Sequence, residues 1–221
     1  HLPVDELEKA KQTLPQDRFE QEYMASFQKT QGLVYKEFSR EKHVKAELPY
    51  TDGRWIDYGA VDFGYRNPAA VLRVKSDGEH AHVSEEWYKR ERTDIQIADY
   101  VSLCKFSAVF PDPENSGAIE ELRRKNVNVR EVIKGKGSVE NGIQAIREML
   151  VRGTLTVNPK CVNLISEFEM YSYDENVPER NDKENPIKAN DHALDALRYV
   201  VSSLLPLVTR KEYLKSLPRF E

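Results

Sequence analysis

The fold follows from two neighbouring runs of sequence, Trp55-Ile56-Asp57-Tyr58-Gly59-Ala60-Val61-Asp62 and Ala69-Ala70-Val71-Leu72-Arg73-Val74. Both are rich in apolar and β-branched or aromatic residues, which favour strands, and a turn containing glycine, asparagine and proline separates them. Residues 82–88 have the same character and predict a third strand. Three strands joined by short turns indicate an antiparallel meander at the start of the domain.

Downstream of the meander, strand-like and helix-like segments alternate. Residues 107–112 and 128–133 are short runs that predict strands, and a segment with helical spacing of apolar residues follows each of them. The second of these helices places Ile143, Ile146 and Leu150 on one stripe. A repeated strand-helix unit indicates parallel pairing. The predicted fold is therefore α/β, a ribonuclease H-like mixed sheet of three antiparallel strands followed by parallel strands, flanked by helices.

The composition is that of an ordinary globular protein. The 221 residues are 39% hydrophobic and 32% charged, with a formal net charge of −4. This acidic balance argues against coating nucleic acid through the overall field, but it permits a local basic groove. The longest apolar stretch, residues 200–208, contains two serines and a proline, so no membrane interaction is expected. The two cysteines lack the paired spacing of a zinc or redox motif, which favours a reducing, cytoplasmic setting.

The chain divides into three predicted parts. Residues 1–45 are polar and helical in character, and we interpret them as a linker or arm from a missing upstream domain. Residues 46–208 form the folded domain, and residues 209–221 form a C-terminal tail. Because the chain starts at His1 without a methionine, we expect either a piece of a longer polypeptide or a start left by cloning. Residues 174–190, which are crowded with charged residues, asparagine and proline, predict a mobile loop.

Four aspartates are candidate catalytic residues and metal ligands. Asp62 ends the first strand, and Asp112 ends the first parallel strand in the same manner. If these strands are neighbours, both carboxylates emerge at one edge of the sheet. A helix beginning at Asp191 carries Asp191 and Asp195 one turn apart, so both can point at one place. Converging oxygen ligands suit Mg²⁺ or Mn²⁺, and a pair of such ions can clamp the attacking and leaving oxygens of a phosphodiester.

Each of these aspartates also has an ordinary structural interpretation. Asp62 could form the turn that follows it, and Asp112 could cap the next helix. The acidic pair of the last helix lies roughly opposite an apolar stripe, which by itself favours solvent exposure. Asp57 competes for the role of Asp62, but it lies five residues earlier and therefore points to the opposite face of the strand.

Other polar residues near these acids are candidates for supporting roles. Glu114, just past a strand end, is a reserve ligand. His192 could contact a metal, lie in its outer shell or carry a proton near the scissile phosphate, and its plain alternative is a helix-start residue. The run Lys134-Gly135-Lys136-Gly137-Ser138 lacks phosphate-loop spacing, but Lys134, Lys136 and the following helix N-terminus suit a DNA phosphate. Arg66 is a further candidate for contact with the DNA backbone.

Four motifs follow one another along the chain: Asp62-Phe63-Gly64, Asp112 at a strand end, Lys134-Gly135-Lys136-Gly137-Ser138, and Asp191-His192-Ala193-Leu194-Asp195-Ala196-Leu197-Arg198-Tyr199. In this order they resemble the nuclease domain of the large terminase subunit of tailed bacteriophages. The resemblance implies an endonuclease that cuts double-stranded viral DNA concatemers during genome packaging, with two divalent ions, Mg²⁺ or Mn²⁺, held by the aspartates. Some relatives have two adjacent acids where this chain has Asp191-His192, so the direct ligand among Asp191, His192 and Asp195 stays open.

The resemblance also implies a set of partners and a location. The partners are double-stranded DNA, an upstream packaging ATPase domain, the portal and the small terminase subunit, and the location is the cytoplasm of the infected bacterial host. Two other functions are kept open. One is a resolvase or transposase-type enzyme of the same fold. The other is a non-catalytic module that guides or docks DNA in a packaging motor.

Overall fold

The computed structural model describes residues 32–48, 54–132, 134–173 and 186–216, and it describes side chains as far as residue 204. The predicted helical character of the first 31 residues and most of the predicted mobile loop at 174–190 lie outside these ranges. Within them, no helix combines the length and the apolar character needed to cross a bilayer.

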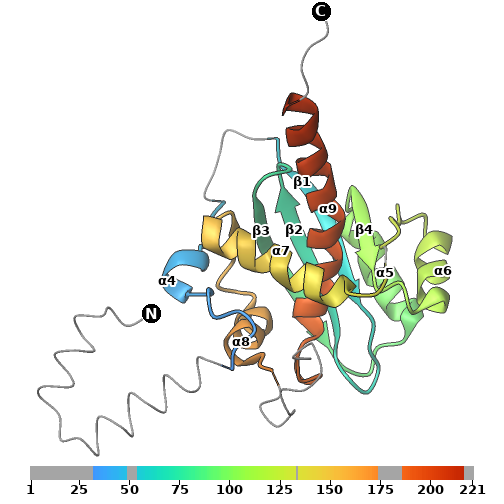
Figure 1. Cartoon of the computed structure of the whole chain (residues 1–221). Coiled ribbons are helices and arrows are strands. Elements are labelled where there is room, and N and C mark those ends of the chain that lie inside the picture. The colour runs from blue at the N-terminus through green and yellow to red at the C-terminus, as the bar shows by residue number, and fades with distance from the viewer. Residues whose placement is uncertain (1–31, 49–53, 133, 174–185, 217–221) are drawn as a thin grey trace, which may run out of the picture.

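A five-stranded mixed sheet forms the centre of the fold (Figure 1). Its strands, in chain order, are β1 (Ile56–Asp62), β2 (Ala69–Ser76), β3 (Ala81–Lys89), β4 (Ala108–Pro111) and β5 (Leu155–Val157). Their order across the sheet is β4-β1-β2-β3-β5. β1, β2 and β3 pair antiparallel, whereas β4 runs parallel to β1 and β5 runs parallel to β3. The predicted ribonuclease H-like mixed sheet is confirmed.

The strand predicted at residues 128–133 is shorter than expected. In the part of the chain that the structure describes, this segment makes an isolated bridge between Val129 and Val109 and no longer ladder. The amide of Val109 donates to Asn128, and the amide of Arg130 donates back to Val109. The next donor along β4 on this side would be residue 111, which is a proline and has no N–H. Pro111 therefore ends the ladder after one bridge.

Helices cover both faces of the sheet (Figure 1). One face carries α5 (Asp94–Cys104) and α6 (Ser116–Arg124), and the other carries α7 (Ser138–Arg152), α8 (Val162–Met170) and α9 (His192–Ser216). Alternation along each strand assigns its side chains to these two cores. In β1, Val61 faces α5 and α6, whereas Ala60 faces the core that contains α9. This parity decides where the polar residues at the strand ends point.

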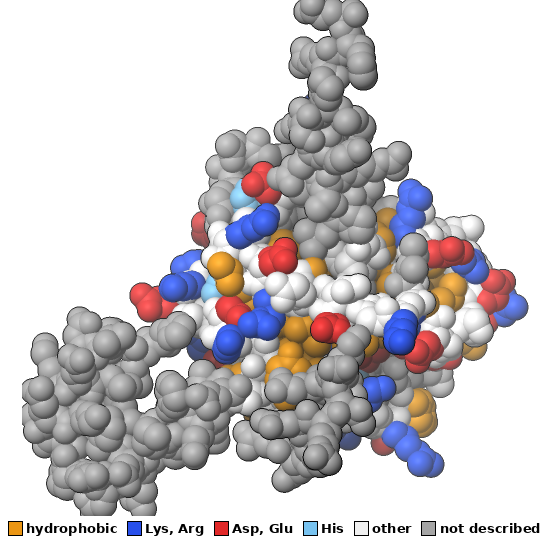
Figure 2. All heavy atoms as spheres, in the orientation of Figure 1, with side chains coloured by type: hydrophobic (Ala, Val, Ile, Leu, Met, Phe, Trp, Pro, Cys, Tyr) orange, Lys and Arg blue, Asp and Glu red, His pale blue; other side chains and the backbone are white. Residues whose placement is uncertain are grey.

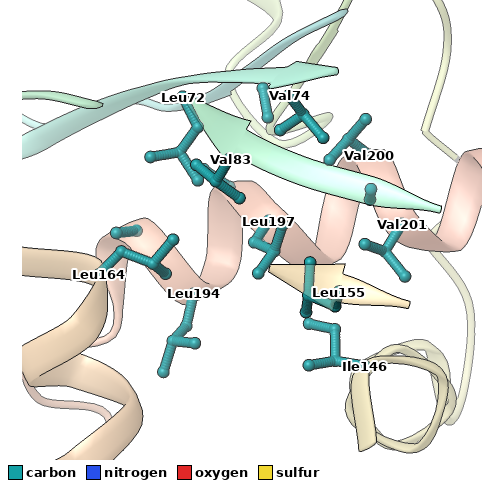
Figure 3. Packing of buried hydrophobic residues seen from close by; sticks show 14 of the residues in the cluster. Leu72, Val74, Val83, Ile146, Leu155, Leu164, Leu194, Leu197, Val200 and Val201 are labelled. Atoms are coloured by element: carbon teal, nitrogen blue, oxygen red, sulfur yellow. The ribbon is translucent and has the colours of Figure 1, made fainter. Parts of the chain in front are cut away.

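The first turns of α9 are enclosed by the rest of the fold. Leu194, Leu197 and Val200 are fully buried among side chains of the sheet, α7 and α8 (Figure 3). Residues on the helix flanks, such as Ala193 and Ala196, are buried as well. The alternative interpretation, in which the acids of this helix form a solvated face, therefore does not hold at Asp191, which is 8% exposed. The helix continues to residue 216, beyond the predicted start of a tail at residue 209, and projects past the sheet (Figure 1).

The described end of the predicted arm packs into the same core. Val34 and Tyr35 are each 1% exposed, and the Val34 amide donates to the carbonyl of Tyr171 at 2.9 Å. The Tyr35 ring contacts the ring of Phe168 edge-on. The short helix α4 (Arg40–His43) follows. The division into 1–45, 46–208 and 209–221 stays a prediction, but residues 33–44 add buried surface to the domain.

A buried glutamate holds the start of α9. Glu167 of α8 is 2% exposed; its Oε2 accepts a hydrogen bond from the Leu194 amide at 2.9 Å, and its Oε1 accepts one from the Tyr88 hydroxyl at 2.8 Å. The first amides of a helix have no partner within the helix, so Glu167 takes the place of an N-cap side chain. Burial is the largest influence on this carboxyl and raises its pKa to about 7, although both hydrogen bonds lower it.

We expect the replacement Glu167→Gln to flatten the pH dependence of stability. Because the folded pKa of Glu167 lies above its ordinary value of 4.5, the folded state binds the proton more tightly than the unfolded state. Its contribution is therefore complete below pH 4.5 and is lost as the pH rises through about 7. At about 1.4 kcal/mol per pKa unit, the loss is about 3 kcal/mol. Urea unfolding of both proteins at acidic and weakly alkaline pH measures it.

Glu169→Gln is the matched control for this measurement. Glu169 lies two residues along α8, and its pKa is lowered, first by the hydrogen bond from Arg40. It therefore does not titrate between pH 5 and 8, and its removal leaves the pH dependence of the free energy of unfolding as in the parent. Parallel curves for the parent and Glu167→Gln would show that Glu167 does not ionise in this range.

Candidate metal centre

Asp62 and Asp112 emerge side by side at the carboxyl edge of the sheet. β1 and β4 are parallel neighbours in which Val61 lies opposite Pro111, and the Asp112 amide donates to the Val61 carbonyl at 2.8 Å. Asp62 has the parity of Ala60, whose side chain faces α9, and Asp112 has the parity of Phe110, which faces the same core. The predicted convergence of these two aspartates at one edge is therefore confirmed.

The turn after Asp62 is tight because residue 64 is glycine. A Cβ atom at Gly64 would lie 2.6 Å from the carbonyl oxygens of Asn67 and Pro68, which is closer than real Cβ contacts allow. The chain can therefore fold back directly after the strand, and Asp62 remains 7% exposed at its end. The motif Asp62-Phe63-Gly64 thus combines a carboxylate with the turn that fixes it in place.

The start of α9 adds Asp191 and His192 to this edge. The helix begins at His192, and the Asp191 carbonyl accepts its first hydrogen bond, from the Asp195 amide at 2.7 Å. The Nδ1 atom of His192 lies 3.0 Å from Oδ2 of Asp62. The two segments lie 130 residues apart in sequence, so the contact depends on the tertiary fold.

Burial and crowding shift the pKa of both partners in this contact. Burial is the largest influence on Asp62 and raises the pKa of its carboxyl; the hydrogen bond with His192 lowers it, and the charges of Asp112 and Asp191 raise it further. The hydrogen bond with Asp62 is the largest influence on His192 and raises the pKa of the imidazole, with a further contribution from Asp191. The edge is therefore a place where negative charge accumulates and attracts protons or cations.

A lysine supplies one such cation. The Nζ atom of Lys134 lies 3.1 Å from Oδ1 of Asp112 and 2.9 Å from Oε1 of Glu114, and 5.5 Å from the centre of the Tyr199 ring. Burial would lower the pKa of Lys134, but the hydrogen bonds to Glu114 and Asp112 outweigh it and raise the pKa. The structure thus pairs Lys134 with two carboxylates at this edge. Lys136, two residues further along, is exposed.

Asp195 differs from the other aspartates because it has its own counter-ion. It forms an ion pair of 2.5 Å with Arg198, one turn further along α9. Burial raises the pKa of Asp195 to about 6, and Arg198 opposes this effect. Arg198 is 7% exposed; burial is the largest influence on its guanidinium and would lower its pKa, but the charge of Asp195 opposes burial and the pKa is raised. A ligand role for Asp195 would require it to leave or share this pair, so the assignment of Asp195 stays a prediction.

The donor set suits a hard divalent cation, although the side chains are not arranged around one. Carboxylate oxygens from two strand ends and a helix start are ligands that Mg²⁺ and Mn²⁺ prefer. Among the residues that the structure describes, no three His, Cys, Asp or Glu side chains stand in a geometry that could hold an ion. Lys134 and His192 instead contact the carboxylates of Asp112 and Asp62. A cation that entered would therefore compete with these two contacts.

The competing acid of β1 lies on the other face of the sheet, as its parity predicts. Asp57 pairs with Arg73 at 3.0 Å and with Lys75 at 3.3 Å, away from α9. Asp57 therefore belongs to a surface ion-pair network and lies outside the site.

The sequence did not predict the roles of Glu167 and Tyr88. Glu167 accepts a hydrogen bond from the first turn of α9, and Tyr88 donates a hydrogen bond to Glu167. A signal for Glu167 was present, because it lies three residues after Leu164 and next to Phe168, both fully buried, on one face of α8. An acid on an apolar helix face needs a buried partner. Tyr88 shares a row of the sheet with Ala70 and Asp62, which only the strand register reveals.

Comparison with known proteins identifies the family of this chain. The family model for the terminase RNAseH like domain matches residues 62–203, more than half of the chain. The large terminase subunit of Escherichia phage T5 is 29% identical over 216 residues, which cover 91% of this chain and 48% of that protein. The chain therefore spans about half the length of this curated relative.

Solved terminase structures share its fold. The large terminase of the thermophilic bacteriophage D6E has a TM-score of 0.69 and 26% identity, covering 79% of this chain and 45% of that one. The nuclease domain of the large terminase g2p from bacteriophage SPP1, solved with bound Mn, has a TM-score of 0.57 and 22% identity, covering 73% and 96%. The family match shows that this chain belongs to the terminase RNAseH like domain family.

Proposed function

We propose that this chain is a metal-dependent endonuclease that hydrolyses phosphodiester bonds of double-stranded viral DNA concatemers during genome packaging. The observation that carries the proposal is the convergence of Asp62, Asp112 and the start of α9 at one edge of the sheet. The nuclease domain of the SPP1 large terminase was solved with bound Mn, which supports a divalent cation as the metal of this chain. We propose two ions, because a pair serves both the attacking and the leaving oxygen of a phosphodiester.

Each acid has a proposed role. Asp62, on which the charges of both Asp112 and Asp191 act, would serve both ions, while Asp112 would hold one of them and Asp191 the other. Asp191 is the better candidate than Asp195, since Asp195 is paired with Arg198. When bound, the ions would supply the Lewis acidity that activates water and stabilises the departing oxygen. His192 holds Asp62 in position through its Nδ1 contact and is an outer-shell residue in this proposal.

The wider setting follows from the relatives. Because the chain spans about half of the T5 large terminase subunit, we propose that an upstream ATPase domain completes the protein. The portal and the small terminase subunit are the partners proposed for the assembled motor, which would work in the cytoplasm of the infected bacterium. Arg66 and Lys136 are proposed to contact the DNA backbone beside the acids, since both are exposed.

Asp62→Asn tests the site. The amide keeps the size of the side chain but removes the charge that a divalent ion requires, so cleavage of plasmid DNA in Mg²⁺ or Mn²⁺ should fall by at least about 100-fold. Calorimetry should show the loss of saturable Mn²⁺ binding by the same variant. Urea unfolding checks that the fold remains.

Asp57→Asn is the matched control, because it removes the same charge from the same strand on the opposite face. It should cleave DNA at the rate of the parent. Retained cleavage by Asp62→Asn would place the metal site elsewhere. Failure of the parent to bind Mn²⁺ at millimolar concentration, with or without DNA, would favour the non-catalytic docking module.

Lys134→Ala tests the competition between lysine and metal. Removing a positive charge that contacts Asp112 should tighten Mn²⁺ binding by roughly fivefold in the absence of DNA, because like charges repel at this range. Lys136→Ala is the control: it removes an exposed lysine two residues away and should leave the dissociation constant for Mn²⁺ unchanged. Equal Mn²⁺ affinity of Lys134→Ala and the parent would show that the lysine does not compete with the ion.

A further inference from the structure

The turn between β1 and β2 is fastened to the segment that follows β3. The amide of Glu91 donates to the Tyr65 carbonyl at 2.8 Å, and the Arg90 guanidinium donates to the Arg66 carbonyl at 3.5 Å. Gly64 tightens the other side of the same turn against the Asn67 and Pro68 carbonyls. Two segments that lie 24 residues apart therefore form one surface next to Asp62.

This surface carries positive charge without counter-ions. Arg66, Arg90 and Arg92 are all exposed, and none of them pairs with a carboxylate among the described residues. Several other arginines are paired with carboxylates, for example Arg73 with Asp57 and Arg147 with Glu37. On the face seen in Figure 2, acidic and basic side chains are likewise interspersed. We name Arg66, Arg90 and Arg92 the basic ridge.

The strand register gives the position of the basic ridge relative to the acids. Asp62 of β1 lies opposite Ala70 of β2, and Ala70 lies opposite Tyr88 of β3, two residues before Arg90. Neighbouring strands are about 4.8 Å apart, so the end of β3 lies about 10 Å from Asp62 across the sheet. Along a DNA duplex this corresponds to about three nucleotides of one strand.

We infer that the basic ridge binds the phosphate backbone of duplex DNA on the β3 side of the cutting site, about three nucleotides from the bond that is cut. The inference rests on the proposed function and names residues that hold its substrate. The chain has a net charge of −4 and an acidic site, so DNA binding needs a local group of cations. Guanidinium groups on a fixed turn match phosphate oxygens with two hydrogen bonds each.

The neighbouring residues are compatible with this partner. Tyr65, at the tip of the turn, is 58% exposed and offers a ring beside the backbone contacts. Glu91, between Arg90 and Arg92, is an exposed acid, and its amide holds the turn. Duplex DNA is favoured over an acidic protein because the ridge continues the edge at which the acids lie.

The test is the salt dependence of duplex binding by the 221-residue chain without divalent metal. Fluorescence anisotropy of a labelled blunt duplex gives the dissociation constant at several salt concentrations. Each phosphate contact contributes roughly 0.9 to the slope of log affinity against log salt, so Arg66→Ala with Arg90→Ala should lower the slope by about two. Between about 50 and 200 mM salt, the affinity of the parent should then fall about tenfold further than that of the variant.

Two further variants make the result specific. Lys105→Ala with Arg152→Ala removes two exposed charges, one just before β4 and one just before β5, at the opposite edge of the sheet, and should keep the slope of the parent. Arg66→Lys with Arg90→Lys keeps the charges and should also keep the slope, which separates charge from damage to the turn.

The outcomes separate this inference from the proposed function. The basic ridge is overturned if Arg66→Ala with Arg90→Ala has the same slope as the parent. It is also overturned if the control, Lys105→Ala with Arg152→Ala, lowers the slope by as much as that variant. If Asp62→Asn loses cleavage while Arg66→Ala with Arg90→Ala keeps the salt dependence of the parent, the proposed nuclease is supported and the basic ridge is rejected. A reduced slope in a chain that never cuts DNA supports the ridge and rejects the nuclease.

Discussion

The packing of α9 against the sheet is the interaction on which the rest of the structure depends. Its leucines and valines fill the core between the sheet, α7 and α8, and the same helix carries Asp191 and His192 at its start. Burial of the helix start would leave its first amides without partners. Glu167 of α8 supplies one, because it accepts a hydrogen bond from the Leu194 amide. The apolar core and one buried carboxylate together fix the position of the helix start, and with it the contact between His192 and Asp62.

Charge repulsion is the second constraint at this edge. The fold brings Asp62, Asp112 and Asp191 together, and burial, followed by the charges of Asp112 and Asp191, raises the pKa of the Asp62 carboxyl. Basic side chains contact these carboxylates: Lys134 contacts Asp112, His192 contacts Asp62, and Arg198 contacts Asp195. An edge that must recruit lysine and histidine to balance its carboxylates is well suited to divalent cations, which would replace several of these contacts at once.

Much of the scaffold could be read from local patterns. Apolar runs at residues 55–62 and 69–74 predict β1 and β2, and the strand end at Asp112 predicts its place beside Asp62. The segment at 128–133 was overestimated because a single proline in the partner strand removes the donor that would continue the ladder. β5 has three residues, which is too short for a periodic pattern. It is defined by its parallel pairing with β3, a contact between distant parts of the chain.

By itself, the sequence determined the meander, the strand-helix repeat, the parity that separates Asp62 from Asp57, and the set of acids available for a site. Such properties depend on neighbours along the chain. The tertiary structure decided that the last helix is enclosed. It also decided that Lys134 forms an ion pair with Asp112 and that Arg198 forms one with Asp195. The hydrogen bond from Tyr88 to Glu167, below the helix start, depends on it as well. The tertiary structure also brought the turn after Asp62 into contact with the segment after β3, through the hydrogen bond from the Glu91 amide to the Tyr65 carbonyl. These outcomes depend on burial and on contacts between residues far apart in sequence, which no local pattern encodes.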